Sequence, residues 1–240
     1  MKLFQNLLLV VLASFLFSSC GNDSNANFTL KGKIKDLKKG VVYLQKDGKT
    51  SIVDLDSVVI KGQEEFTLQA NIKEPVLLYL KLQKKDGQEH FIPFFADKGV
   101  TEITTTLKGF SGDAIIKGSK QQALLEEYLE LRDGFQNKNL DLLKANFEAV
   151  KAQDSAKAEE LYQQSDRLLK LKYASTINFA LRNNDSEVAP YIAIYEIPNS
   201  NAKYLDSIYN NLSERVKQSY YGKKLGDALE AYKNKKDSIK

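Results

Sequence analysis

The pattern of hydrophobic and polar positions changes character near residue 118. Before it, short apolar runs alternate with turn residues, and the segments 28–34 and 66–72 place apolar residues at every second position. This period is typical of strands with one face in solvent. Residues 76–82 are apolar on both faces, which predicts a central strand. Pro93 lacks an amide hydrogen, so its strand is expected at a sheet edge or at a bulge.

Two Asp-Gly dipeptides, Asp47-Gly48 and Asp86-Gly87, each separate a pair of apolar runs. Asp-Gly suits a tight hairpin in which both turn residues have positive φ. The sequence therefore predicts a β lobe at residues 28–118, with about seven to nine antiparallel strands in a β-sandwich or an open barrel.

From residue 119 onward, apolar residues recur at intervals of three and four, which is the period of helices. Ser119 and Gln122 predict a capping box, in which Ser119 accepts from the third helical amide and Gln122 reaches back. A further helix is expected at residues 202–211, and Ser213 is expected to cap another. The sequence predicts a helical lobe of about five helices at residues 119–236, and hence an α+β chain.

The first nineteen residues have the organisation of an export signal. Lys2 is followed by about eleven apolar residues, whereas a membrane-spanning helix needs about 20. Residues 1–19 are therefore predicted to be a removable signal peptide. Ser18 and Ser19 before Cys20 resemble the lipobox of lipoprotein precursors, which places the cleavage between Ser19 and Cys20. The alternative is an ordinary secretory signal that happens to precede a cysteine.

Cys20 is the only cysteine, so the chain can form neither an intrachain disulfide nor a Cys-x-x-Cys redox couple. Its thiol is the expected lipid attachment site, since two or three acyl chains anchor a protein durably in a membrane. Residues 20–27 are rich in Gly, Asn and Ser and are expected to form a flexible tether, and residues 237–240 a mobile tail. By resemblance to Gram-negative sorting rules, Gly21 favours the outer membrane, on its periplasmic or its surface side.

Residue types limit the candidate chemistry. Lys and Arg number 35 and Asp and Glu 31, a balance that gives no indication of nucleic-acid binding. His90 is the only histidine, so no His-pair metal site, Ser-His-Asp triad or Cys-His dyad can be built. Asp54 and Asp56 lack the continuing ligands of a calcium loop, and the glycines form no phosphate-binding motif. No catalytic residue, metal site or cofactor is expected.

Two features of the helical lobe each allow two interpretations. Ten of the twelve tyrosines lie in it, and they are expected to pack in its core, although tyrosines also stack on sugars or anchor protein partners. The last helix is rich in lysines, including Lys223, Lys224 and Lys233. A solvated helix face is the expected role, and an electrostatic contact with acidic lipid head groups is the alternative.

The order of several motifs resembles a domain of unknown function that precedes the thioredoxin-like domain in envelope disulfide reductases of Bacteroidota. The motifs are Phe28-x-Leu-x-Gly-x-Ile34, Val42-Tyr-Leu44, Asp56-Ser57-Val58, Gly62, Phe66-Thr-Leu68, Ile116-Lys-Gly118-Ser119 and Tyr220-Tyr-Gly222-Lys-Lys-Leu225. The resemblance extends from Phe28 to about Tyr232. Those reductases continue into the thioredoxin-like domain where this sequence ends at Lys240, so the resemblance implies the accessory module without reductase chemistry.

Four Asp-Ser-apolar strings are similar to the O-glycosylation acceptor of envelope proteins in this phylum. They would place the modification on Ser57, Ser155, Ser207 and Ser238. Asp-Ser is also an ordinary helix start, and the sequence leaves both interpretations open.

The function expected from these features is that of a lipid-anchored, non-catalytic module of the cell envelope that binds or scaffolds a partner. One alternative is an accessory subunit for a separately encoded thioredoxin-like protein. The other is a hydrolase that uses carboxylates alone, which would need two facing carboxylates in a pocket.

Overall fold

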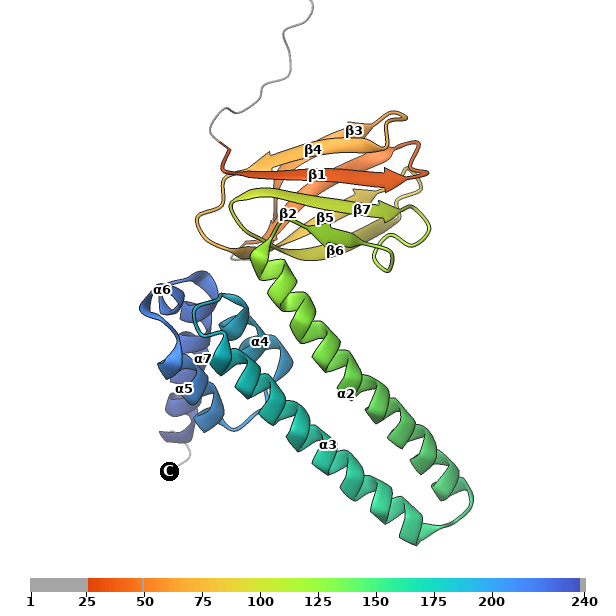
Figure 1. Cartoon of the computed structure of the whole chain (residues 1–240), viewed down its shortest axis with the longest axis vertical. Helices are drawn as coiled ribbons and strands as arrows, with labels where there is room; N and C mark the ends of the chain where they lie inside the picture. The colour runs from red at the N-terminus through yellow and green to blue at the C-terminus, as the bar shows by residue number, and fades with distance from the viewer. Residues whose placement is uncertain (1–25, 49, 238–240) are drawn as a thin grey trace, which may run out of the picture.

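The computed structural model describes residues 26–48 and 50–237. The chain folds into a β lobe followed by a helical lobe, the α+β architecture expected from the sequence (Figure 1). The described residues form eight strands and six helices. Asn27, which was expected in the tether, exchanges hydrogen bonds with residues 71–72.

The strands form two four-stranded sheets with the orders β4-β1-β7-β8 and β3-β2-β5-β6. They are β1 (Phe28–Lys35), β2 (Gly40–Asp47), β3 (Ile52–Ile60), β4 (Glu65–Ala70), β5 (Val76–Gln83), β6 (Glu89–Ala96), β7 (Gly99–Thr106) and β8 (Ile115–Lys117). Alternate side chains of both sheets meet in one core, where the rings of Phe28 and Phe94 lie 6.3 Å apart. The result is a sandwich that is not closed into a barrel.

Two strand predictions are confirmed and one is wrong. β5 lies inside its sheet, and β6, which contains Pro93, lies at the edge. The expectation of purely antiparallel strands is wrong, because β1 and β7 pair in parallel with Phe28 opposite Gly99. Alternation of apolar residues reports the period of a strand but not its direction.

The two Asp-Gly hairpins form, but neither turn has positive φ at both of its central residues. Gly87 has a φ of +83°, and its turn closes with a hydrogen bond from Lys84 N to Gln88 O of 2.9 Å. Gly48 is not among the residues of positive φ, and its amide donates to Ser51 O at 2.9 Å. Both loops are longer than two residues, and only a two-residue loop requires positive φ at both central residues.

The helices are α2 (Lys120–Lys151), α3 (Ser155–Arg182), α4 (Val188–Glu196), α5 (Ala202–Asn211), α6 (Glu214–Lys217) and α7 (Tyr220–Asp237). α5 has the predicted bounds, and Ser213 caps α6 by accepting from Val216 N. The described part has one helix more than expected, because the last predicted helix divides at Ser219. The Ser219 hydroxyl donates to Val216 O at 2.7 Å and accepts from Gly222 N at 3.2 Å, which starts α7.

Half of the predicted capping box forms. Ser119 accepts from the Gln122 amide at 3.0 Å, as expected. Gln122 does not reach back: its side-chain oxygen accepts from the amide of Phe95 at 2.8 Å, and its side-chain nitrogen donates to Glu126. Phe95 lies on an edge strand, where a buried amide without a sheet partner needs another acceptor.

The two lobes share a hydrophobic core. Leu77 of β5 and Phe95 of β6 are buried among the helical residues. The ring of Phe95 lies 5.5 Å from that of Tyr191 and 5.6 Å from that of Tyr221. The amide of Leu77 donates to the Tyr221 hydroxyl at 3.3 Å.

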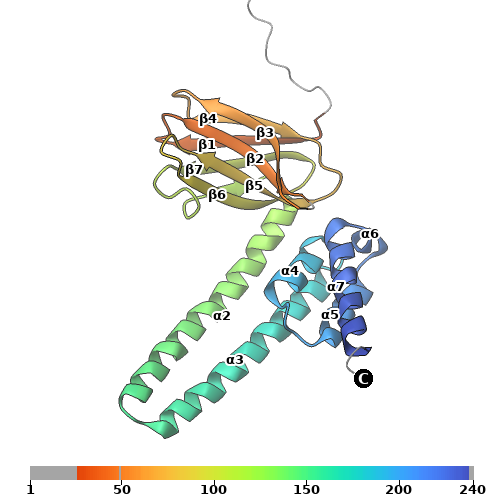
Figure 2. The same cartoon turned by 180° about the vertical axis from the view of Figure 1, so that it is seen from behind.

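α2 and α3 form a long antiparallel hairpin that extends away from the β lobe (Figures 1 and 2). α2 has 32 residues, which at 1.5 Å per residue gives a length of about 48 Å. The shorter helices α4–α7 gather around the end of α3 that lies near the β lobe, and they leave the far part of the hairpin uncovered (Figure 2).

Phe95→Ala should lower the free energy of unfolding by about 3–5 kcal/mol, because it empties a site that both lobes share. Chemical denaturation followed by circular dichroism should show one cooperative transition for wild type and variant. Phe91→Ala is the matched control on the same strand; Phe91 is 37% exposed and its ring faces Lys81, so a loss of about 0.5–1 kcal/mol is expected. Separate transitions for strands and helices would show that the lobes fold independently.

Candidate functional site

An aromatic cluster lies where the lobes meet. Tyr191 and Tyr195, one turn apart on α4, have ring centroids 4.8 Å apart, and the Tyr221 ring lies 5.3 Å from Tyr191. Tyr221 is only 3% exposed, and burial raises the pKa of its hydroxyl. Tyr191 and Tyr221 thus pack in the core, whereas Tyr195 is exposed at its rim.

An open cleft of about 820 Å³ lies beside this cluster, between the β2–β3 hairpin and α7. Lysines and two aspartates line it together with Tyr220; the charged residues are Lys46, Asp47, Lys223, Lys224 and Asp227. The Lys224 ammonium donates to the Tyr195 hydroxyl at 2.6 Å, and this hydrogen bond raises the pKa of Lys224. Among the described residues, four have a buried side-chain atom without a hydrogen-bond partner: Gln45, His90, Thr101 and Ser200. None of these four lines the cleft. The cleft is wide, and its described lining residues carry charges of both signs.

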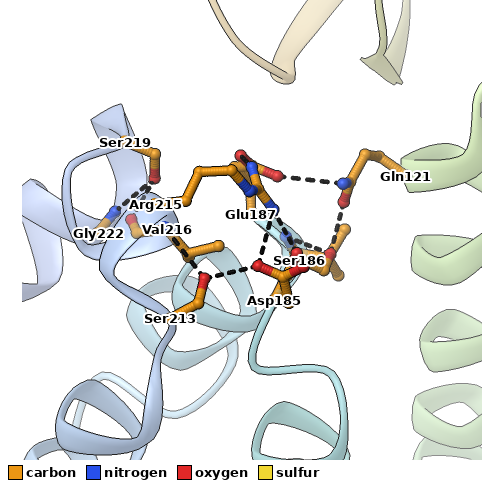
Figure 3. Close-up of polar contacts among 10 residues, drawn as sticks. Gln121, Asp185, Ser186, Glu187, Ser213, Arg215, Val216, Ser219 and Gly222 are labelled. Atoms are coloured by element: carbon orange, nitrogen blue, oxygen red, sulfur yellow. Dashed lines mark hydrogen bonds and ion pairs between the residues drawn. The ribbon is translucent and has the colours of Figure 1, made fainter.

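A buried carboxylate, Glu187, lies at the centre of a polar network that joins three helices (Figure 3). Its side chain is 1% exposed. Arg215 donates to one carboxylate oxygen, and Gln121 donates to the other at 3.1 Å. Burial raises the pKa of Glu187, and Arg215 and hydrogen bonding oppose the shift without cancelling it. Since both oxygens have partners, the geometry is that of a structural link.

The rest of the network fixes the turns around it. Ser186 donates to the Gln121 side chain and accepts from the amide of Val188, the first residue of α4. Asp185 accepts from the Ser213 hydroxyl at 2.6 Å, and this hydrogen bond, with the charge of Arg215, lowers the pKa of Asp185. The network therefore ties the first turn of α2 to α4 and α6.

The far part of the α2–α3 hairpin exposes large apolar side chains on one side. On α2 they follow intervals of three, four and three residues, which places them on one face of the helix. On α3 two more are seven residues apart. We call this set the hairpin face: Leu140, Leu143, Phe147, Val150, Tyr162 and Leu169, each between 48% and 70% exposed.

A groove of about 630 Å³ runs along the hairpin between α2 and α3. Leu142, Leu161, Leu168 and Leu171 contribute to its lining, together with charged residues. None of the hairpin-face residues lines this groove. The hairpin therefore has one side with a partly filled groove and another with an exposed apolar face.

The predicted modification sites do not gather at any of these places. Ser19, Cys20 and Ser238 lie outside the described residues. Ser57 is exposed on β3, Ser155 is exposed at the start of α3, and Ser207 is half-buried within α5. Asp154 caps α3 by accepting from the Lys157 amide at 2.9 Å, which is the role of an ordinary helix start.

The acidic pair and the histidine have structural contacts. Asp54 accepts from the Gln45 side chain at 2.6 Å, and Asp56 accepts from the amide of Gln69 at 2.7 Å. His90 is half-buried on β6 against the ring of Phe110. Within residues 26–48 and 50–237, no group of three or more His, Cys, Asp or Glu side chains could hold a metal ion. Among the same residues, no helix is long and apolar enough to cross a membrane.

Neither the Glu187 network nor the hairpin face is predicted from the sequence. The spacing of Leu140, Leu143, Phe147 and Val150 is visible in the sequence, and it could have indicated a helix face. Whether such a face is buried depends on where the neighbouring helices lie, which the spacing does not report. Glu187 and Arg215, 28 residues apart, had no signal at all.

Comparison with known proteins gives one domain assignment. Residues 28–125 match the family model of a domain of unknown function (DUF4369), which covers the β lobe and the first turns of α2. No curated protein matches the chain. The crystal structure of a 9R-lipoxygenase from Cyanothece PCC8801 aligns at 16% identity with a TM-score of 0.24, over 42% of this chain and 20% of that chain. The chain thus spans about a fifth of the lipoxygenase's length, and a likeness this low carries no functional conclusion.

Glu187→Gln should change the pH dependence of stability. Because the pKa of Glu187 is raised in the folded state, its contribution to stability is present at low pH and is lost as the pH rises through the raised pKa. The free energy of unfolding of the wild type, minus that of the variant, should therefore fall between about pH 4 and pH 7. Urea denaturation at both pH values measures it.

Glu214→Gln is the control for the loss of one carboxylate, since the Glu214 side chain is 83% exposed. It removes a carboxylate from the surface, where a substitution changes the free energy of unfolding by less than about 0.5 kcal/mol. A difference for Glu187→Gln that rises with pH would contradict the dominant role of burial at this site.

Proposed function

We propose that the protein is a lipid-anchored, non-catalytic module of the outer membrane that binds or scaffolds a protein partner through the hairpin face. The observation that supports this proposal is the exposure of six large apolar side chains on one side of a projecting helical hairpin. Contiguous apolar patches of this kind are uncommon on monomeric soluble proteins, and they mark interaction surfaces.

The position of the proposed anchor supports a protein, rather than the membrane that holds the anchor, as the partner of the hairpin face. β1 begins on the β lobe, while the tip of the α2–α3 hairpin lies at the opposite end of the molecule (Figure 1). A tether of residues 20–26 reaches at most about 25 Å, whereas α2 alone, with its 32 residues, is about 48 Å long. With Cys20 lipidated and the molecule standing on its β lobe, the hairpin face lies away from the membrane, where a protein partner can reach it.

A separately encoded thioredoxin-like envelope protein is the alternative partner. What supports it is the match of residues 28–125 to a domain of unknown function, together with the resemblance of the motif order to the domain that precedes thioredoxin-like domains. In that case the protein supplies the accessory module, and the redox chemistry belongs to the partner.

Lipid attachment is tested in the native host with labelled palmitate. The wild type should take up the label and sediment with membranes, because Cys20 carries the acyl chains that anchor it. Cys20→Ala should lose both the label and the membrane fraction. Ser24→Ala, in the same segment, should change neither. Unchanged membrane retention of Cys20→Ala would refute the anchor.

Partner binding is tested by photo-cross-linking in the host, with a photoreactive amino acid at position 144 beside the hairpin face. Adducts are expected with the wild-type face and should be lost in Leu143→Glu/Phe147→Glu, since two buried charges oppose apolar docking. Leu171→Glu is the matched control, because Leu171 is 59% exposed on α3 but lines the groove. Adducts that survive the double substitution would refute the hairpin face as the binding surface. Their masses would distinguish a thioredoxin-like partner from others.

A further inference from the structure

We infer that the hairpin face docks against the same face of a second copy, so that two hairpins lie side by side with their tips pointing the same way. This inference rests on the proposed function in two respects: it names the partner of the hairpin face, and lipid anchoring in one membrane gives both copies the same orientation. The arrangement follows from the spacing of the apolar residues, the area that they expose and the charges beside them.

The spacing on α2 is that of a helix–helix seam. Leu140, Leu143, Phe147 and Val150 occupy alternating intervals of three and four residues, the pattern of the a and d positions of a coiled coil. Within one copy, this stripe has no helix to pack against, since all four side chains are more than half exposed. A second helical surface of similar width would complete the seam.

The exposed area is sufficient for a dimer. Each of the six hairpin-face side chains is between 48% and 70% exposed, and burying such a side chain removes roughly 100 Å² of apolar surface from water. Docking would then bury about 600 Å² on each copy and about 1,200 Å² in total, at the lower end of the range for stable interfaces. Neighbouring polar side chains would add to this area.

The charged residues beside the hairpin face include two lysines on α2 and two acids on α3. Lys144 and Lys151 follow Leu140 and Phe147 by four residues, and both are exposed along α2. On α3, Glu159 and Asp166 precede Tyr162 and Leu169 by three residues and are also exposed. Glu159 accepts from the side chain of Gln163, and Asp166 pairs with Lys170 at 2.7 Å within the same helix, so both acids keep intrachain partners. The α2 flank of the face thus carries two lysines with Glu148 between them, and the α3 flank carries two acids, one of them paired with Lys170.

These charges select one of the two symmetric arrangements. A two-fold axis along the hairpin places α2 of one copy over α3 of the other, and lysines then face acids. A two-fold axis across the hairpin places α2 over α2, and lysines face lysines, which is unfavourable. Two copies anchored in one membrane are related by an axis perpendicular to it. With the hairpin standing away from the membrane, that is the axis along the hairpin, which the charges also favour.

The test measures the mass of the full chain, purified from host membranes in detergent, by sedimentation over a range of concentrations. A concentration-dependent dimer is expected for the wild type. Phe147→Glu should yield a monomer, and Leu171→Glu should dimerise like the wild type. Circular dichroism melting curves of both variants should match the wild type, which separates loss of binding from loss of folding. A wild-type monomer at all concentrations would overturn the inference.

Charge reversal tests the arrangement itself. Lys144→Glu/Lys151→Glu should weaken dimerisation about tenfold, because it places like charges on each side of the interface. Adding Glu159→Lys/Asp166→Lys should restore the dissociation constant to within about threefold. Failure of this restoration would refute the parallel arrangement. One combined outcome separates this inference from the proposed function. If the purified protein is monomeric, and cross-linked adducts that depend on Leu143 and Phe147 have a mass other than that of a dimer, a second copy is refuted as the partner. The proposed function then stands.

Discussion

The arrangement of the two lobes depends on the hydrogen bond between the backbone amide of Phe95 and the side chain of Gln122, 2.8 Å long. Phe95 lies on the edge strand β6, so its amide would otherwise be buried without a partner. Two residues further, Asp97 accepts from both the Ser119 hydroxyl and the Gln121 amide. The end of β6 thus completes the N-terminus of α2. This fixes where α2 leaves the β lobe and in which direction it runs.

The exposed hairpin face is a consequence of that direction. Near the β lobe, α2 buries Leu125 and Tyr128 against the helical core, and Tyr128 exchanges a hydrogen bond with Thr176 of α3. The described helices α4–α7 gather near the β lobe and do not extend to the hairpin tip (Figure 1). Beyond their reach, α2 and α3 have only each other to pack against. In a pair of helices, each helix covers only the stripe of its partner that faces it. The second apolar stripe of α2, which faces away from α3, therefore stays in solvent.

The sequence predicts the elements that depend on local pattern and misses the contacts that depend on distant partners. β5, the edge position of β6 and the bounds of α5 follow from apolar runs, a proline and helix period. The parallel pairing of β1 with β7 does not, because strands of either direction share one period. Gln122 illustrates the same limit. Its position relative to Ser119 satisfies a local capping rule, yet its side-chain oxygen accepts a hydrogen bond from the amide of Phe95. The Arg215–Glu187 pair has no local pattern at all.

The hairpin face contributes little to the stability of its own chain. The helices are stabilised by contacts that the hairpin face does not contribute, such as the pairs Lys157–Glu160 and Asp166–Lys170 on α3. Such exposed pairs contribute little because solvent screens them, and the seam between α2 and α3, with buried Ala149 and Leu161, adds packing. Leu143 and Phe147 are more than half exposed, so replacing them removes little buried surface from the single chain. A face that contributes so little to the fold of its own chain gains its free energy only when another surface covers it.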